Sequence, residues 1–140
     1  MRVLAVDFGD VRTGYAISDV TGFLAGETGV IASYRPAEVA EKLAELCVRA
    51  GVERVVVGRP LNMNGTVGER AEKCEAFAQM LRETYGLDVA LWDERLTSVD
   101  ANRILSDAGK KRGKQSARVD AVAASLILEG YLGYLRRGVQ

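Results

Sequence analysis

The chain has 140 residues, of which 48% are hydrophobic and 27% charged; 19 are basic, 19 are acidic and none is histidine. This size and balance predict one globular domain over residues 1–140, and no apolar run approaches the roughly 20 residues that cross a bilayer, so we expect a cytoplasmic protein with no membrane partner. The lack of histidine excludes Ser-His-Asp and Cys-His catalysis and imidazole metal sites, which leaves carboxylates, arginine or lysine and a hard cation for any hydrolytic chemistry.

Three strand-like segments open the chain, at residues 2–7, 14–20 and 24–31. The turns between them are short, which predicts an antiparallel meander. A helix is expected over residues 36–50, with a proline in its first turn. Residues 52–57 form a short β-branched run, which is typical of a strand buried on both faces.

The second half of the chain alternates helix and strand. Thr66 and Glu69 have the spacing of a capping box, which predicts a helix from there to about Tyr85. A fifth strand is expected over residues 87–93. A further helix is expected over residues 97–108, where a threonine and an aspartate again have the spacing of an N-terminal cap.

The last helix is expected to begin near Ser116 and to run past Tyr134. Its apolar stripe is predicted to comprise Val119, Val122, Ala123, Leu126 and Ile127. A meander followed by alternating helices and strands predicts an α/β domain with a mixed five-stranded sheet, in which strands four and five are parallel and helices flank the sheet.

Four residues with reactive or aromatic side chains are expected in the core. Cys47 and Cys74 lie among apolar residues at helical spacing and lack metal-ligand spacing, so we expect both to be reduced and buried. Trp92 and Tyr131 are expected to pack in the interior rather than to stack on bases.

Asp7 ends the first apolar run and is followed at once by a glycine turn. Burying a bare carboxylate costs several kcal/mol unless it is paired or binds a metal. Gly9 and Gly14 leave backbone amides open to a ligand, and Arg12 places a planar cation suited to phosphate beside them. The alternative is a tight hairpin with an acidic tip.

Glu94 and Asp120 are the other two acids in unusual places. Glu94 follows the fifth strand, on the face of Trp92, and Asp120 lies in an apolar part of the last helix, where stabilisation of the helix dipole is the alternative role. In α/β sheets ligands gather outside the carboxyl ends of the strands, so Asp7 and Glu94 can converge there. Clustered carboxylates repel unless divalent cations neutralise them, and two such ions about 4 Å apart can activate water against a phosphodiester.

Several polar side chains near these acids are candidates for contacts with nucleic acid. Arg12, Arg59 and Arg95 are interpreted as groups that position phosphates, with a structural salt bridge to a nearby acid as the alternative. Asn62 and Asn64 are candidates for hydrogen bonds to a sugar or a base edge, or for shaping their own turn.

Basic residues crowd one short segment of this otherwise neutral chain: Lys110, Lys111, Arg112, Lys114 and Arg118. The run from Lys110 to Lys114 is bracketed by glycines and is interpreted as a mobile basic loop that grips a phosphate backbone. A solvated charge run is the alternative.

Four motifs stand in order along the chain: Asp7-x-Gly9-x-x-Arg12-x-Gly14, Gly58-Arg59-Pro60-Leu61-Asn62-Met63-Asn64-Gly65-Thr66, Asp93-Glu94-Arg95-x-Thr97 and Asp120-Ala121-Val122-Ala123-Ala124. Over nearly its whole length the chain thereby resembles the YqgF (RuvX) family of bacterial RNase H-like proteins, described as Holliday junction resolvases and pre-16S rRNA nucleases. The resemblance implies an RNase H-like domain whose acidic triad corresponds to Asp7, Glu94 and Asp120. It also favours ribosomal RNA maturation over junction resolution.

Together these observations predict a nuclease that uses Mg²⁺ or Mn²⁺, as two ions, on precursor rRNA or branched DNA. Asp7 is expected to bridge both ions, with Glu94 and Asp120 holding one or sharing them. We expect a monomer or a homodimer. The alternatives are a Holliday junction resolvase, a nucleic-acid-binding scaffold without turnover, and a kinase-like or actin-like ATP-binding protein, which would need two such domains.

Overall fold

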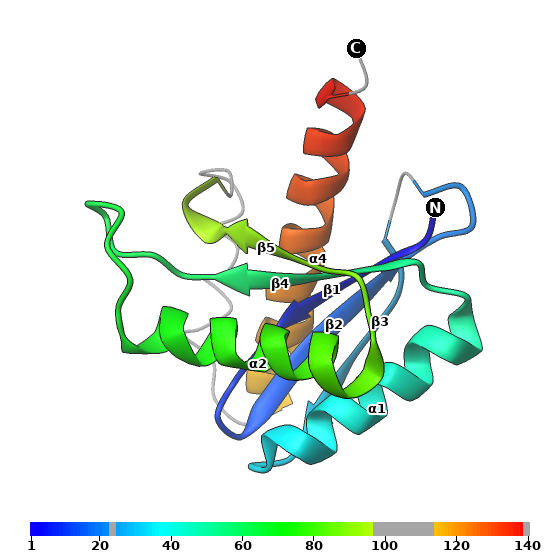
Figure 1. Cartoon of the computed structure of the whole chain (residues 1–140). Helices are drawn as coiled ribbons and strands as arrows, with labels where there is room; N and C mark the ends of the chain where they lie inside the picture. The colour runs from blue at the N-terminus through cyan, green and yellow to red at the C-terminus, as the bar shows by residue number, and fades with distance from the viewer. Residues whose placement is uncertain (23–24, 97–113, 139–140) are drawn as a thin grey trace.

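The computed structural model describes residues 1–22, 25–96 and 114–138, with side chains from residue 119 onward in the last helix. Its centre is a five-stranded sheet in the order β3-β2-β1-β4-β5 (Figure 1). The strands are β1 (Val3–Asp7), β2 (Arg12–Ser18), β3 (Ala25–Ala32), β4 (Arg54–Arg59) and β5 (Val89–Asp93).

The sheet is mixed, as the sequence predicts. β1, β2 and β3 pair antiparallel, whereas β4 runs parallel to β1 and β5 runs parallel to β4. β1 is the central strand, and its side chains from Val3 to Val6 are completely buried because helices cover both faces of the sheet. The predicted fold class, an α/β domain on a mixed five-stranded sheet, is confirmed.

Helices α1 (Pro36–Ala50) and α2 (Glu69–Tyr85) cover one face of the sheet, and α4 (Lys114–Gly138) covers the other (Figure 1). A single 3-10 turn, η1 (Glu94–Leu96), follows β5. The bounds of α1 match the predicted helix, because a proline fixes its first turn and Gly51, in the left-handed conformation, ends it.

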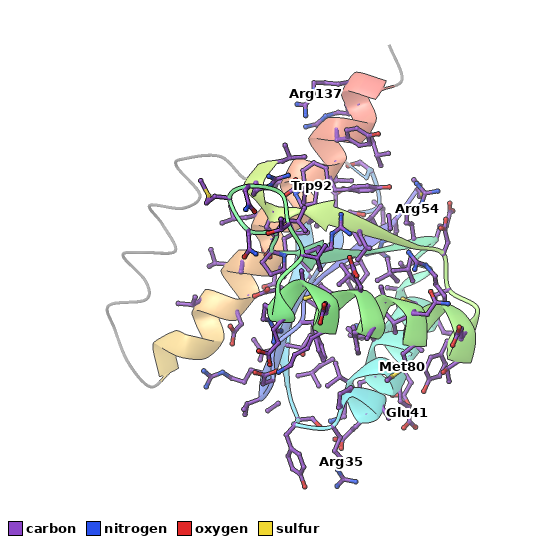
Figure 2. All side chains as sticks on the ribbon, turned by 60° about the vertical axis from the view of Figure 1, so that its left-hand side comes forward. Arg35, Glu41, Arg54, Met80, Trp92 and Arg137 are labelled. Carbon is purple, nitrogen blue, oxygen red and sulfur yellow. The ribbon has the colours of Figure 1, made fainter. Side chains whose placement is uncertain are left out.

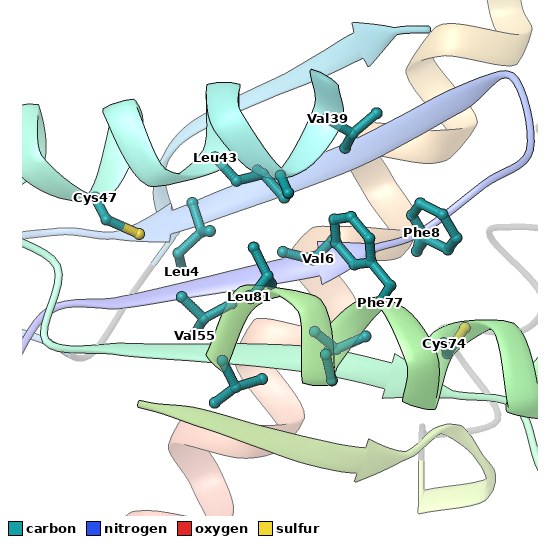
Figure 3. Packing of buried hydrophobic residues seen from close by; sticks show 14 of the residues in the cluster. Leu4, Val6, Phe8, Val39, Leu43, Cys47, Val55, Cys74, Phe77 and Leu81 are labelled. Carbon is teal, nitrogen blue, oxygen red and sulfur yellow. The ribbon is translucent and has the colours of Figure 1, made fainter. Parts of the chain in front are cut away.

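The face covered by α1 and α2 holds the larger apolar cluster (Figure 3). The rings of Phe8 and Phe77 stack in it with centroids 4.1 Å apart. The two cysteines are free and buried here, as predicted, and burial raises the pKa of each thiol to about 11. Large side chains from the sheet and the helices interlock on this face, chiefly Leu4, Val6, Val55, Leu43 and Leu81.

The face covered by α4 holds a second cluster, to which Trp92 belongs (Figure 2). Trp92 packs edge-on against Tyr131 with ring centroids 6.0 Å apart. Both aromatic residues are core residues, as predicted. The predicted apolar stripe of α4 is right only at Ile127, which is buried; Val119, Val122, Ala123 and Leu126 are half-buried. The helix is rotated so that its buried positions are Ala124, Ile127, Leu128, Tyr131 and Leu132.

One local prediction at a helix start is also wrong. Thr66 does not cap α2; its hydroxyl bonds to the side chains of Asn62 and Asn64, and the helix begins three residues later with Gly68 as its N-cap. α4 begins at Lys114, close to the predicted start near Ser116, so the last residue of the predicted basic loop belongs to a helix. Strands β2 and β4 are each displaced by two residues from their predicted bounds because sheet pairing sets their ends.

The helix predicted over residues 97–108 lies outside the described residues. Among the helices that the structure does describe, none combines the length and apolar character needed to cross a membrane.

Candidate active site

Asp7 and Glu94 meet at the carboxyl edge shared by the parallel strands β1, β4 and β5. Asp7 is the last residue of β1, and Glu94 directly follows β5 as the first residue of η1. Val3 and Ala5 of β1 face α4, so strand alternation also turns Asp7 toward that helix. Asp120 lies on α4 one turn before Ala124, on the helix face that covers the sheet.

Two glycines flank Asp7 on its neighbouring strands and make room for the other acids. Gly14 pairs with Asp7, and a Cβ at Gly14 would lie 2.0 Å from the carbonyl oxygen of Asp120. A Cβ at Gly58, in β4, would lie 2.6 Å from Cδ1 of Ile127 and 3.1 Å from Oε1 of Glu94. The backbone of α4 and the carboxylate of Glu94 can therefore approach the strand ends only because both positions lack a side chain.

Burial and mutual repulsion shift the ionisation of two of these acids. Desolvation, followed by the charge of Asp120, raises the pKa of Asp7 to about 6, against a lowering effect of Arg70. Desolvation and the charge of Asp7 raise the pKa of Glu94 to about 7, again opposed by Arg70. Carboxyls that keep protons near neutral pH because of burial and a nearby charge are typical of functional sites.

Arg70 is the residue of this site that sequence reasoning missed. It lies in the first turn of α2 and donates hydrogen bonds to the carbonyl oxygen of Phe8 and, over 3.0 Å, to Oδ1 of Asp10. Its charge lowers the pKa of both Asp7 and Glu94. The only sequence signal was a basic residue at the start of a helix that follows a β-strand at the sheet's carboxyl edge.

The chemistry of the donors fits a hard divalent cation, because the site offers partly buried carboxylate oxygens and no histidine. As the side chains stand, however, no three acids, cysteines or histidines of the described residues form a group ready to hold a metal ion. One reason is that Asp120 is already engaged: Nε of Arg12 lies 3.1 Å from its Oδ2. Cation binding by all three acids would require Asp120 to leave Arg12.

The three arginines predicted to position phosphates all have acidic partners. Arg12 pairs with Asp120, Arg59 pairs with Glu75 over 2.6 Å, and Arg95 pairs with Asp93 over 2.7 Å. Nε of Arg59 is nevertheless buried without a hydrogen-bond partner. The structure therefore shows the three arginines in salt bridges, which was the alternative to phosphate binding. A role in phosphate binding stays a prediction for each of them.

The remaining loop residues shape their turns. A Cβ at Gly9 would lie 2.0 Å from the carbonyl oxygen of Arg12, so this position of the β1–β2 turn requires glycine. The side chains of Asn62 and Asn64 both bond to Thr66 within their loop, at 2.9 Å and 2.7 Å. These contacts match the turn-shaping alternative, and substrate contacts by the two asparagines stay a prediction.

Little of the basic segment is described, although the backbone of Arg118 lies two residues before Asp120 in α4. Lys110, Lys111 and Arg112 lie outside the described residues, and Lys114 and Arg118 are described only as backbone of α4. Their role in binding nucleic acid stays a prediction.

Sequence comparison decides the family. A family model described as "RuvX: Holliday junction resolvase" matches residues 1–134. The chain belongs to the RuvX family. A protein of Halothermothrix orenii named "Putative pre-16S rRNA nuclease" is 43% identical over 134 residues, which cover 96% of each chain. A protein of Bacillus cytotoxicus with the same name is 44% identical over 134 residues, covering 94% of this chain and 98% of the relative. The predicted family resemblance is thus confirmed.

Solved structures agree with this assignment at the level of the fold. RuvC of T. thermophilus, in complex with a Holliday junction substrate, superposes with a TM-score of 0.65 at 17% identity, covering 99% of this chain and 96% of that chain. The Fowlpox virus resolvase in complex with Holliday junction DNA gives a TM-score of 0.58 at 14% identity, covering 96% and 99%. The chain therefore has the fold of RuvC-like resolvases.

Proposed function

We propose that this chain is a nuclease of the two-metal-ion type that hydrolyses phosphodiester bonds in structured nucleic acid. Its physiological reaction would be 5′-end processing of precursor 16S rRNA in the cytoplasm, with Mg²⁺ or Mn²⁺ as cofactor. The observation that carries the proposal is the pair of acids Asp7 and Glu94 at one sheet edge. Burial and the charges of neighbouring acids, Asp120 for Asp7 and Asp7 for Glu94, raise the pKa of Asp7 to about 6 and that of Glu94 to about 7.

Each side chain of the site has a distinct part in this proposal. Asp7 and Glu94 would hold the cations, since desolvation raises the pKa of both carboxyls. Asp120 would complete the set of cation ligands after its carboxylate has left the salt bridge with Arg12. When bound, the ions would activate water and stabilise the leaving oxygen. Arg70, whose charge reaches both buried acids, is placed to attract a phosphate to this edge.

The names of the relatives support the substrate class. Relatives above 40% identity over nearly the whole chain are named as pre-16S rRNA nucleases. The second candidate function is Holliday junction resolution, and the description of the matching family favours it. A non-catalytic scaffold is the third candidate, against which stands the retention of all three acids. The oligomeric state, monomer or homodimer, stays a prediction.

Cleavage by the purified protein tests the activity. The substrates are a precursor 16S rRNA fragment with its 5′ leader and a four-way DNA junction, each with Mg²⁺, with Mn²⁺ and with excess EDTA. We expect cleavage only with a cation and none by Asp7→Asn. Full cleavage in EDTA would rule out the metal mechanism, and binding without cleavage under any condition would favour the scaffold.

Sequencing of rRNA 5′ ends in cells depleted of the protein separates the two substrates. Accumulation of extended 16S precursors is the expected result. Normal 5′ ends together with a recombination defect would favour junction resolution.

A further inference from the structure

A cavity lies behind the candidate active site, on the opposite face of the sheet. Its volume is about 320 Å³, and its walls come from the β1–β2 turn, the segment between β3 and α1, and one side of α2. Phe8 and Phe77 form part of the wall, as do Val39 and Met80, and Figure 3 shows the first three at one end of the apolar cluster. The walls are therefore largely apolar and partly aromatic.

The mouth of this cavity is open to solvent. Aromatic and basic side chains of the kind that bind nucleotides surround it. Tyr34 lines it although its side chain is 76% exposed, and the guanidinium of Arg35 lies 5.8 Å from the centre of the Tyr34 ring. Figure 2 shows Arg35 projecting outward from the start of α1. Lys73 lines the same cavity. An aromatic ring and cations beside an apolar cavity are the elements that hold a base together with its phosphates.

Arg70 connects the cavity to the acids. It lies one helical turn before Lys73 on α2, and its guanidinium is 5.6 Å from the centre of the Phe8 ring, a wall of the cavity. Its charge also reaches Asp7 and Glu94. Phe8 directly follows Asp7, the last residue of β1, and packs on the opposite face of the sheet, so only the end of one strand separates the acids from the cavity.

We propose that this cavity binds an unpaired nucleobase of the substrate strand, next to the phosphate presented to Asp7 and Glu94. The strand would leave the acidic site along Arg70 and Lys73, and the base would enter between Tyr34 and the apolar wall. The inference rests on the proposed nuclease function and adds to it a preference for a substrate with a base free to leave its stack. Unstacking a base is least costly in bulges, junctions and single strands.

Asp10 opposes entry of a strand in the present arrangement. Its carboxylate accepts hydrogen bonds from Arg70 at 3.0 Å and from Lys73 at 3.3 Å, and these contacts lower the pKa of Asp10. A phosphate would have to replace it as the partner of both cations. Asp10→Asn should therefore strengthen binding of single-stranded nucleic acid, because it removes the anion that the two cations share without changing the shape of the mouth.

Filling the cavity and opening it are complementary tests. Ala76 lines the cavity from an exposed position of α2, so Ala76→Leu should fill it without disturbing the core. Tyr34→Ala should remove one wall. The probe is a short single-stranded RNA with 2-aminopurine placed at successive positions, and every protein carries Asp7→Asn so that nothing is cleaved. Both changes should weaken binding about 5- to 100-fold and abolish the fluorescence change at one position.

Matched controls separate base binding from altered folding or charge. Gln79→Leu adds the same side chain at an exposed position of α2 that does not line the cavity, and Tyr34→Phe keeps the ring. Both should bind the RNA as tightly as their parent, which carries Asp7→Asn alone. An abasic nucleotide at the responsive position should remove the difference between Ala76→Leu and its parent. Equal binding and equal fluorescence for Ala76→Leu and its parent would overturn the inference alone, whereas no RNA binding by any variant would overturn the proposed function as well.

Discussion

The two faces of the sheet are built in opposite ways, although they share the same five strands. Toward α1 and α2 the strands present large side chains, such as Leu4 and Val6, which interlock with those of the helices. Toward α4, near the carboxyl edge, the strands present Gly14 and Gly58 beside Asp7. The α4 face has an apolar cluster of its own, around Trp92 and Tyr131, but at this edge it lacks side chains, so that a helix backbone and two further acids can come close. Both faces therefore contribute apolar burial, and the candidate acids lie only on the face of α4.

Leu81→Ala should produce the largest loss of stability, on the face covered by α1 and α2. Leu81 is completely buried in that cluster, and removing such a side chain costs about 2–5 kcal/mol of unfolding free energy. Chemical denaturation measures the change, with Val48→Ala, at a position 85% exposed on α1, as a control expected within about 0.5 kcal/mol. The Leu81→Ala protein that remains folded should keep its nuclease activity. Loss of activity in fully folded Leu81→Ala would show that the two faces are not independent.

Gly14→Ala should lower the stability less than Leu81→Ala does, but it should abolish the nuclease activity. The new methyl group would meet the carbonyl oxygen of Asp120 at 2.0 Å, so α4 must shift, at a cost of about 1–3 kcal/mol. That shift separates Asp120 from Asp7. Gly133→Ala, within α4, is the matched control, because only the flexible end of Arg137 lies nearby, at 3.6 Å, and alanine favours helix. If Gly14→Ala cleaves normally, close approach of α4 is not needed for the reaction.

The buried acids should make stability depend on pH in a defined direction. The folded-state pKa values of about 6 for Asp7 and about 7 for Glu94 lie above the values expected in the unfolded chain, so the folded state holds more protons between about pH 4 and pH 7. The unfolding free energy should therefore fall as pH rises through this window, by about 1–3 kcal/mol, and then level off. Denaturation titrations at pH 5 and pH 8 measure this difference.

Asp7→Asn should flatten this dependence. At pH 8 it should be as stable as the wild type or more stable by up to about 1 kcal/mol, because one of the repelling charges is gone. Added Mg²⁺ should stabilise the wild type more than the variant, since binding to the folded state alone shifts the unfolding equilibrium. A clearly destabilised but still active Asp7→Asn protein would overturn the catalytic assignment.

Arg12→Gln should have the smallest effect on stability. The pair with Asp120 is partly exposed, with 44% and 25% of the two side chains accessible, so its loss should change the unfolding free energy by about 0–1 kcal/mol. Nucleic-acid binding measured against salt concentration is the sharper readout. If Arg12 also contacts a phosphate, the slope of log affinity against log salt should fall by about 0.7–0.9. An unchanged slope would leave Arg12 with the salt bridge alone.

Patterns confined to a few residues predicted much of the fold. The meander, the two parallel strands and the bounds of α1 follow from alternation, β-branched runs and the proline and glycine at the helix ends. The position of Asp7 and Glu94 at one edge follows from two strands that run parallel and end in an acid. Each of these inferences needs only the chain direction and the period of side chains along a strand or helix.

Contacts between distant segments decided the rest. Thr66 had the spacing of a cap, but two asparagines of its own loop compete for its hydroxyl. The close approach of α4 to the strands at Gly14 and Gly58 is likewise a contact between distant segments, which the apolar stripe of the helix does not specify. Arg12 and Asp120 are 108 residues apart in the chain, and the cation that reaches both buried acids, Arg70, comes from a helix on the other side of the sheet. A sequence motif states which groups are present, but the charge that each group carries depends on how far it is removed from water and which neighbours the fold brings within a few ångströms.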